Sequence, residues 1–195
     1  MATLIRIADG NSKLGKVPNI SLIPGKDCGN CQSCVKDCYA VKFWRMHPTV
    51  RAAWSANSEL CHGDRNAYFD GVRAYLADKR PKYFRWHVAG DILDQDYLER
   101  MKAIARAFPQ TSFLCFTKMH SLRFSRLPRN LTVVASMWPG LQPHRNVAKL
   151  PKAWMQDGSE TRVPDDAVPC PGNCESCGMC WALPMLERDV VFHKH

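Results

Sequence analysis

The chain has 195 residues, of which 46% are hydrophobic, and a formal net charge of +9. This composition excludes a disordered chain, and no stretch approaches the ~20 consecutive apolar residues of a membrane-spanning helix. The positive charge suits a polyanionic partner, although Lys and Arg are scattered through the sequence rather than run together. We therefore expect one domain, residues 1–195, with no membrane association.

The first part of the chain predicts a short strand and then helices. Residues 1–26 read as an extended lead-in, with an apolar strand at 19–23. From Tyr39 the pattern becomes helical, with Pro48 suited to the first turn of one helix and Asp64 to the cap of the next. This part is expected to be α-rich up to about Lys79.

The central part predicts parallel βα units. KYFRWHVAGD, TSFLCFTK and LTVVASMW read as strands, and Asp96 with Glu99 forms a capping box for the helix between the first two. Residues 82–136 are therefore expected to form a βαβ core, part of a partial (β/α) barrel or an open parallel sheet, since a full barrel needs about 250 residues. Residues 139–170 show no period and are expected to wrap the sheet, before a last short strand in DVVFHKH.

Eight of the ten cysteines form two compact quartets. The first, in the loop at 27–40, consists of Cys28, Cys31, Cys34 and Cys38; the second, at 170–181, consists of Cys170, Cys174, Cys177 and Cys180. C-x2-C-x2-C-x3-C is the spacing by which bacterial ferredoxins bind [4Fe–4S] clusters, and the second quartet is nearly its mirror image. The spacing favours one or two iron–sulfur clusters, expected as metal loops near both ends of the chain.

Zinc and disulfides are the alternatives. Structural zinc sites usually pair two C-x2-C knuckles, so Cys28/Cys31 could join Cys177/Cys180 in one site if the two ends of the chain meet. Disulfides need an oxidising compartment, and the N-terminal residues lack the apolar core of a signal peptide. A reducing cytoplasm is the simpler expectation.

Short polar segments follow the predicted strands. In parallel sheets ligands bind beyond the carboxyl ends of the strands, which makes these residues cofactor-binding candidates. The candidates are Gly90, Asp91, Thr117, Lys118 and Ser136. Asp91 has two readings: it binds an ammonium or a ribose hydroxyl, or it caps the following helix.

Several motifs together resemble the phage gene product 88 family, and the resemblance covers nearly the whole chain. They are Asn19-Ile20-Ser21-Leu22, Cys38-Tyr39-Ala40, the Val50…Asn57…Leu60 helix, Arg85-Trp86-His87-Val88-Ala89-Gly90-Asp91, Phe116-Thr117-Lys118, and Cys177-x2-Cys180-Trp181 with Phe192 and His195. That family is in turn similar to phage radical S-adenosylmethionine-like proteins, in which a CYA motif and two strand-end motifs occur in the same order.

The resemblance implies roles for individual residues. Cys28, Cys34 and Cys38 would hold a [4Fe–4S] cluster with one iron open to S-adenosylmethionine, and Asp91 would contact the methionine amino group. Cys31 departs from the radical-enzyme pattern, because a cluster with four protein ligands has no open iron. The second quartet would hold an auxiliary cluster or zinc.

Two functions from different classes follow. The leading expectation is a phage-type, radical-S-adenosylmethionine-like redox enzyme, with an electron donor protein and a nucleic acid or nucleotide as substrate. The rival is a non-catalytic iron–sulfur or zinc protein that binds nucleic acid through its basic surface. No residue is assigned as catalytic, and the number of ligands on the first cluster separates the two.

Overall fold

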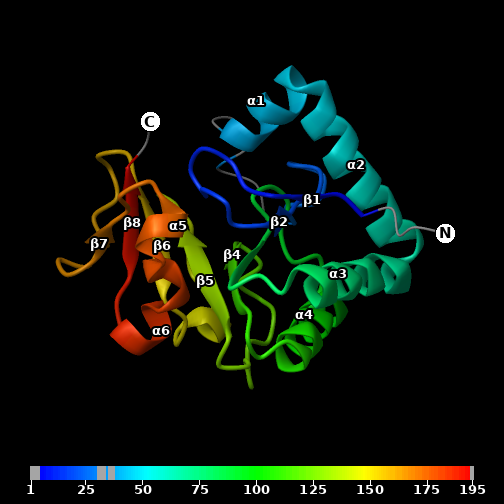
Figure 1. The fold of residues 1–195 in the computed structure, drawn as a ribbon. Helices are drawn as coiled ribbons and strands as arrows, with labels where there is room; N and C mark the ends of the chain where they lie inside the picture. Colours follow the sequence, from blue (N-terminus) through cyan, green and yellow to red (C-terminus); the bar gives the residue numbers. More distant parts are fainter. Residues whose placement is uncertain (1–4, 30–33, 35–37, 194–195) are drawn as a thin grey trace.

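The computed structural model describes residues 5–29, 34 and 38–193. A twisted sheet forms the centre, with α3 and α4 on one side and the C-terminal segment on the other (Figure 1). The strands are β1 (Ile7–Ala8), β2 (Asn19–Ile20), β3 (Tyr83–Trp86), β4 (Ser112–Thr117), β5 (Leu131–Met137), β6 (Lys152–Gln156), β7 (Val168–Pro169) and β8 (Val190–His193). The helices are α1 (Tyr39–Met46), α2 (Pro48–Gly63), α3 (Arg65–Lys79), α4 (Gln95–Ala107), η1 (Arg145–Val147), α5 (Cys174–Cys177), η2 (Met179–Trp181) and α6 (Leu183–Leu186).

The eight strands form one open sheet in the order β1-β2-β3-β4-β5-β6-β8-β7. Every neighbouring pair is parallel except β1 with β2. The sheet ends at β1 and β7, so the open parallel sheet is confirmed and the strands do not close into a barrel. From β2 to β6 the strands follow chain order, which places right-handed crossover connections on one face of the sheet. The other face must be covered by a different part of the chain.

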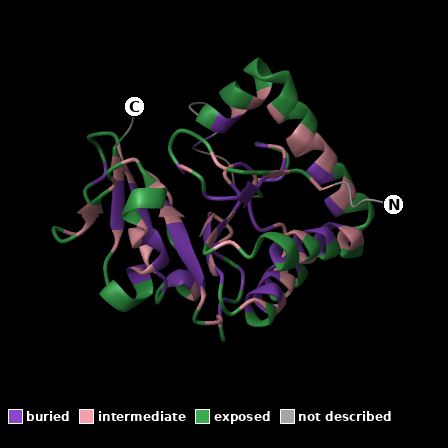
Figure 2. Cartoon of the chain, viewed as in Figure 1, coloured by how far each residue is buried: buried purple, intermediate pink, exposed green. Residues whose placement is uncertain are grey.

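The main core lies between the sheet and the helices on its first face. Buried residues are concentrated in the strands and on the sheet-facing sides of α3 and α4 (Figure 2). Trp86 and Phe113 from the strands pack with Tyr97 and Met101 from α4. α3 begins as expected, since the Asp64 carboxylate accepts a hydrogen bond from the Ala67 N–H at 2.9 Å.

The predicted start of α4 was wrong by two residues. Asp94, in extended backbone, caps the helix by accepting the Tyr97 N–H at 2.9 Å. The Asp96 carboxylate lies in the first turn of the helix and instead accepts from Arg100 at 2.8 Å and from Arg65 at 3.2 Å. The capping box with Glu99 is therefore absent, because Asp96 is already inside the helix.

The second face of the sheet is covered by two segments that are distant in sequence. Leu14 and Val17 from before β2 meet Trp181 and Leu183 from the C-terminal region over this face. The Thr132 hydroxyl of β5 donates to the Trp181 carbonyl at 2.9 Å, which fixes this cover to the sheet. The second cysteine quartet thus belongs to the cover of the sheet.

The segment expected to wrap the sheet contributes to the sheet itself. Residues 139–170 contain β6 and β7, which pair with β5 and β8. The two strands have five and two residues, and they are too short to show a period among prolines and polar residues. In the described part of the chain no helix is both long and apolar enough to cross a membrane.

Candidate functional site

The carboxyl ends of β3 and β4 and the start of the first cysteine loop meet at Asp91. One Asp91 carboxylate oxygen accepts the Lys118 N–H at 2.8 Å, and the other accepts the Ile92 N–H at 2.7 Å. The Asp91 N–H donates to the Asp27 carbonyl at 2.8 Å. Asp91 therefore connects three loops, and the reading of Asp91 as a helix cap is wrong, because Asp94 caps α4.

The electrostatic state of Asp91 follows from its burial. The residue is only 4% exposed, and this burial raises the pKa of its carboxyl to about 6, against the opposing effect of the donors at Lys118, Thr117 and Ile92. A carboxylate has about four lone-pair sites, so the two backbone amides and the Thr117 hydroxyl do not exhaust its capacity to accept hydrogen bonds. Asp91 can hold the loops and still accept a further donor that reaches it.

The first cysteine loop starts directly beside this acid. The Cys28 thiol accepts the Gly25 N–H at 3.2 Å. Burial raises the pKa of Cys28, the nearby Asp91 charge adds to this, and Lys118 opposes it. Cys34 is buried, and Cys38 is half-buried at the position before α1. Cys31 lies outside the described residues.

Close packing fixes this loop against the strand ends. Gly90 has φ +83°, and a Cβ added there would lie 2.7 Å from the Leu22 Cβ. Gly29 has φ +55°, and a Cβ there would meet the end of the side chain of Met119, a residue that follows β4. The glycines therefore let the first cysteine loop and the turn after β3 approach their neighbours more closely than other residues could.

The remaining predicted residues extend along the same edge. The Thr117 hydroxyl accepts the Met119 N–H at 3.0 Å, and Ser136 is half-buried near the end of β5. The Lys118 ammonium lies 5.3 Å from the centre of the Trp138 ring. Sequence reasoning did not include His120, which is buried at this edge. Burial lowers the pKa of His120, whereas the nearby backbone of Ser136 and Thr117 raises it.

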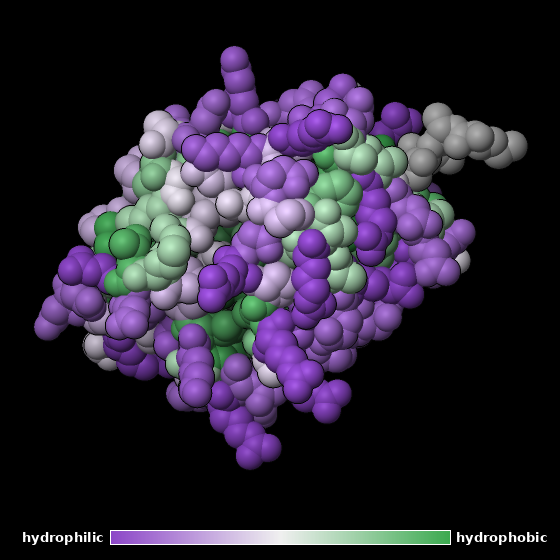
Figure 3. Space-filling model, turned by 60° about the horizontal axis from the view of Figure 1, so that its bottom comes forward, coloured by the Kyte–Doolittle hydropathy of each residue, from purple (hydrophilic) through white to green (hydrophobic). Residues whose placement is uncertain are grey.

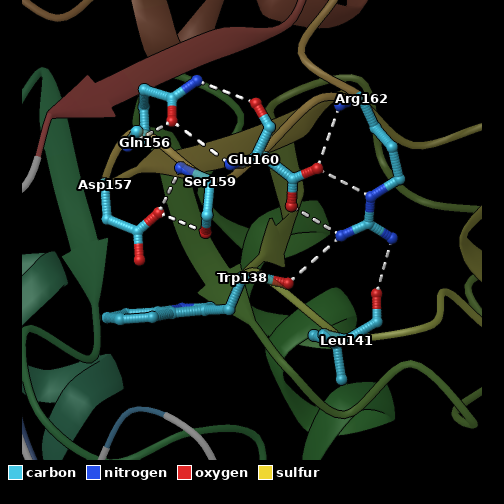
Figure 4. Close-up of polar contacts among 8 residues, drawn as sticks. Trp138, Leu141, Gln156, Asp157, Ser159, Glu160 and Arg162 are labelled. Atoms are coloured by element: carbon cyan, nitrogen blue, oxygen red, sulfur yellow. Dashed lines mark hydrogen bonds and ion pairs between the residues drawn. The ribbon is translucent and has the colours of Figure 1, made fainter.

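An ion pair between Arg162 and Glu160 holds the loops after β5 and β6 together (Figure 4). Arg162 donates to both carboxylate oxygens of Glu160, at 2.7 and 2.6 Å, and also to the carbonyls of Trp138 and Leu141. Hydrogen bonds from Arg162 hold the pKa of the Glu160 carboxyl below its usual value, although the side chain is only 2% exposed and burial acts in the opposite direction. This pair positions Trp138 beside Lys118, and no periodic pattern in the sequence indicated it.

The second quartet lies on the other face of the sheet. Cys170, Cys174, Cys177 and Cys180 all line one small cavity of about 10 Å³, together with Trp181. None of the four is in a disulfide. The pKa of Cys180 is raised to about 12, mainly by burial and also by the neighbouring Cys170 and Cys174, while Arg85 acts in the opposite direction.

The described cysteines of the two quartets do not show ligand geometry. Among residues 5–29, 34 and 38–193, no group of three or more His, Cys, Asp or Glu side chains is arranged to hold a metal ion. The thiols of the second quartet share a cavity without meeting at coordination distance. Cys28 lies beside Asp91, whereas Cys177 and Cys180 line the cavity on the sheet face, so the structure does not join these cysteines in a zinc ribbon.

Exposed apolar side chains gather on α1, which follows the first cysteine loop. Tyr39, Phe43 and Met46 are exposed, and their spacing places them on one side of the helix. Residues 39–58 include Lys42 and Arg45 but no Asp or Glu. On the side of the molecule at the bottom of Figure 1, hydrophilic side chains cover most of the surface and apolar groups form separate patches (Figure 3).

Comparison with known proteins bears on the family alone. Searches of curated proteins and of solved structures found no match to this chain. The family model described as gene product 88 matches residues 2–183, which is nearly the entire sequence. The chain therefore belongs to the gene product 88 family.

Proposed function

We propose that the protein is an iron–sulfur, radical-S-adenosylmethionine-like redox enzyme. The observation that supports this most is the position of Cys28, whose thiol lies next to Asp91 and Lys118 at the carboxyl ends of parallel strands. Parallel sheets bind their ligands at this edge. A cysteine loop in this place puts a metal centre and a ligand site side by side.

The first quartet would hold a [4Fe–4S] cluster through Cys28, Cys34 and Cys38, with Cys31 as an additional thiol. When bound, such a cluster would supply electrons. The residues of this chain would position S-adenosylmethionine. Asp91 would accept a hydrogen bond from its ammonium group, and the backbone amides of Ile92 and Lys118 hold the Asp91 carboxylate in place. Gly90, Thr117 and Ser136 complete the site along the same edge.

The second quartet would hold an auxiliary cluster, with zinc as the alternative metal. Its donor set fits either metal, because four thiols face one cavity and Arg85 provides a positive charge nearby. Thiols with raised pKa values lose their protons when a metal binds, so metal affinity at this site should increase with pH. An electron donor protein is the expected partner of such an enzyme.

Electron paramagnetic resonance of the anaerobically reduced protein tests the proposal. Adding S-adenosylmethionine should change the wild-type signal, and Cys34→Ala should lose both the cluster and the response. Cys31→Ala should keep both, if three cysteines are the ligands. Cys61→Ala serves as the control, because this buried cysteine lies outside both quartets. A wild-type signal that ignores S-adenosylmethionine would contradict the enzyme.

The rival function, a non-catalytic metal protein that binds nucleic acid, is favoured by α1. Exposed aromatic rings beside basic side chains are the combination that single-stranded nucleic acids bind by stacking and phosphate contacts. The double variant Lys42→Gln/Arg45→Gln should then weaken single-stranded DNA binding and lower its salt dependence. Arg129→Gln/Lys149→Gln removes the same charge from exposed sites elsewhere and should leave binding unchanged.

A further inference from the structure

A larger cavity adjoins the second quartet. Its volume is about 420 Å³, within the range of small-molecule sites, and its walls come from residues 12–13, the end of β8 and the loop that precedes α5. Lys13 and His193 line it, and no Asp or Glu is among the described residues of its wall. Such a lining favours a negatively charged ligand.

Phe192 gives this cavity an aromatic wall. Its ring packs edge to face on Phe116 at 5.9 Å between ring centres, and the Lys13 ammonium lies 5.4 Å from the centre of the Phe192 ring. The Arg85 guanidinium lies 4.8 Å from the centre of the Phe116 ring. The cavity therefore combines a cation with an aromatic ring, which suits an anion that also carries a planar group.

Two residues connect the cavity to the cysteines. Cys170 and Pro171 line both the 420 Å³ cavity and the small cavity that Cys174, Cys177 and Cys180 share. The connection is fixed by the backbone: the Cys170 N–H donates to the Val191 carbonyl at 2.9 Å, and the Cys174 N–H donates to the Lys13 carbonyl at 3.0 Å. A ligand in the larger cavity would lie against Cys170.

We propose that this cavity binds a small organic anion with a planar ring, of the mononucleotide class, and places it beside the metal of the second quartet. Lys13 and His193 contact the anionic group, and Phe192 contacts the ring. The contact with a metal rests on the function proposed above, whereas binding in the cavity does not. The second quartet then has a ligand of its own, separate from the site at Asp91.

Calorimetric titration of the anaerobically purified protein with adenosine monophosphate tests the cavity. Adenosine monophosphate should bind. Adenosine and inorganic phosphate should each bind at least about tenfold more weakly, because each supplies only half of the contacts. Lys13→Gln should weaken binding of the nucleotide by about tenfold or more. Phe192→Leu should weaken it by about fivefold.

Lys16→Gln is the matched control, since Lys16 is also exposed but does not line the cavity. Equal losses in Lys13→Gln and Lys16→Gln, or no binding by the wild type, would overturn the proposal. The contact with the metal is measured separately by electron paramagnetic resonance. The nucleotide should shift the signal of the second quartet, which is the signal that Cys174→Ser removes. An unchanged signal would overturn this contact. A chain without iron would refute the proposed function, and the Lys13 comparison would still decide the cavity.

Discussion

Replacing Gly90 by alanine tests the close packing at the centre of the candidate site. Gly90 has φ +83°, a conformation that costs an L-residue about 1–2 kcal/mol. The new Cβ would lie 2.7 Å from the Leu22 Cβ and 3.3 Å from the Leu22 Cα. Leu22 is fully buried, so it cannot move aside, and overpacking of this kind costs a further 1–3 kcal/mol, roughly. We expect Gly90→Ala to lower the free energy of unfolding by about 2–5 kcal/mol.

Gly140→Ala separates the two contributions. Gly140 has φ +80°, and a Cβ there would meet no atom within 4 Å. This variant should therefore show only the backbone cost of about 1–2 kcal/mol. The assay is urea unfolding of both variants and the wild type, prepared in the same metal state. Equal losses in the two variants would refute the packing of the turn after β3 against Leu22.

Four further predictions concern charged and titratable groups. Arg162→Ala should lower the free energy of unfolding by about 1–2 kcal/mol at pH 7, because it removes the hydrogen bonds to Glu160, Trp138 and Leu141, and Glu160→Gln in the same chain should recover part of the loss in urea unfolding. Burial lowers the pKa of His87 from 6.5 to about 3. Between these pH values the unfolded chain binds more protons than the folded chain, so the free energy of unfolding should decrease as pH falls from 6.5 to about 3. Asp91 has the opposite effect on stability, because its pKa rises from 3.8 to about 6 and the folded chain binds more protons than the unfolded chain between these values. The wild type therefore gains stability from this carboxyl as pH falls from about 6 to about 4. Asp91→Asn lacks this gain and should lose stability more steeply than the wild type over the same range. In calorimetry at pH 7, Asp91→Asn should also weaken S-adenosylmethionine binding by ~10-fold or more without changing the iron content, whereas unchanged binding would remove Asp91 from the ligand site.

Local signals in the sequence predicted much of the fold. Pro48 and Asp64 begin their helices as expected, because a fixed φ and a capping carboxylate act within one turn of the chain. The apolar runs around Phe84, Phe113 and Val133 form central strands of a parallel sheet. Asp94 was missed because Asp91 and Asp96 offered competing caps, and only the backbone shows where the first turn begins.

Contacts between distant segments could not be predicted in the same way. The approach of Asp91 to Lys118 is an exception, because it follows from a general property of parallel sheets, in which strand ends meet at one edge. The pairing of Glu160 with Trp138 through Arg162 depends on how two irregular loops fold. The contact between Trp181 and Thr132 depends on the C-terminal segment that covers the sheet, and no periodic pattern in the sequence indicates that segment.

Iron, sulfide and zinc analysis after strictly anaerobic purification tests the central claim most directly. The wild type should be brown, with about eight irons per chain and matching sulfide, as two [4Fe–4S] clusters require. Cys28→Ser/Cys34→Ser and Cys174→Ser/Cys180→Ser should each retain about half of the iron, and Cys61→Ala should retain all of it. A colourless wild-type protein with stoichiometric zinc and no sulfide would contradict the account.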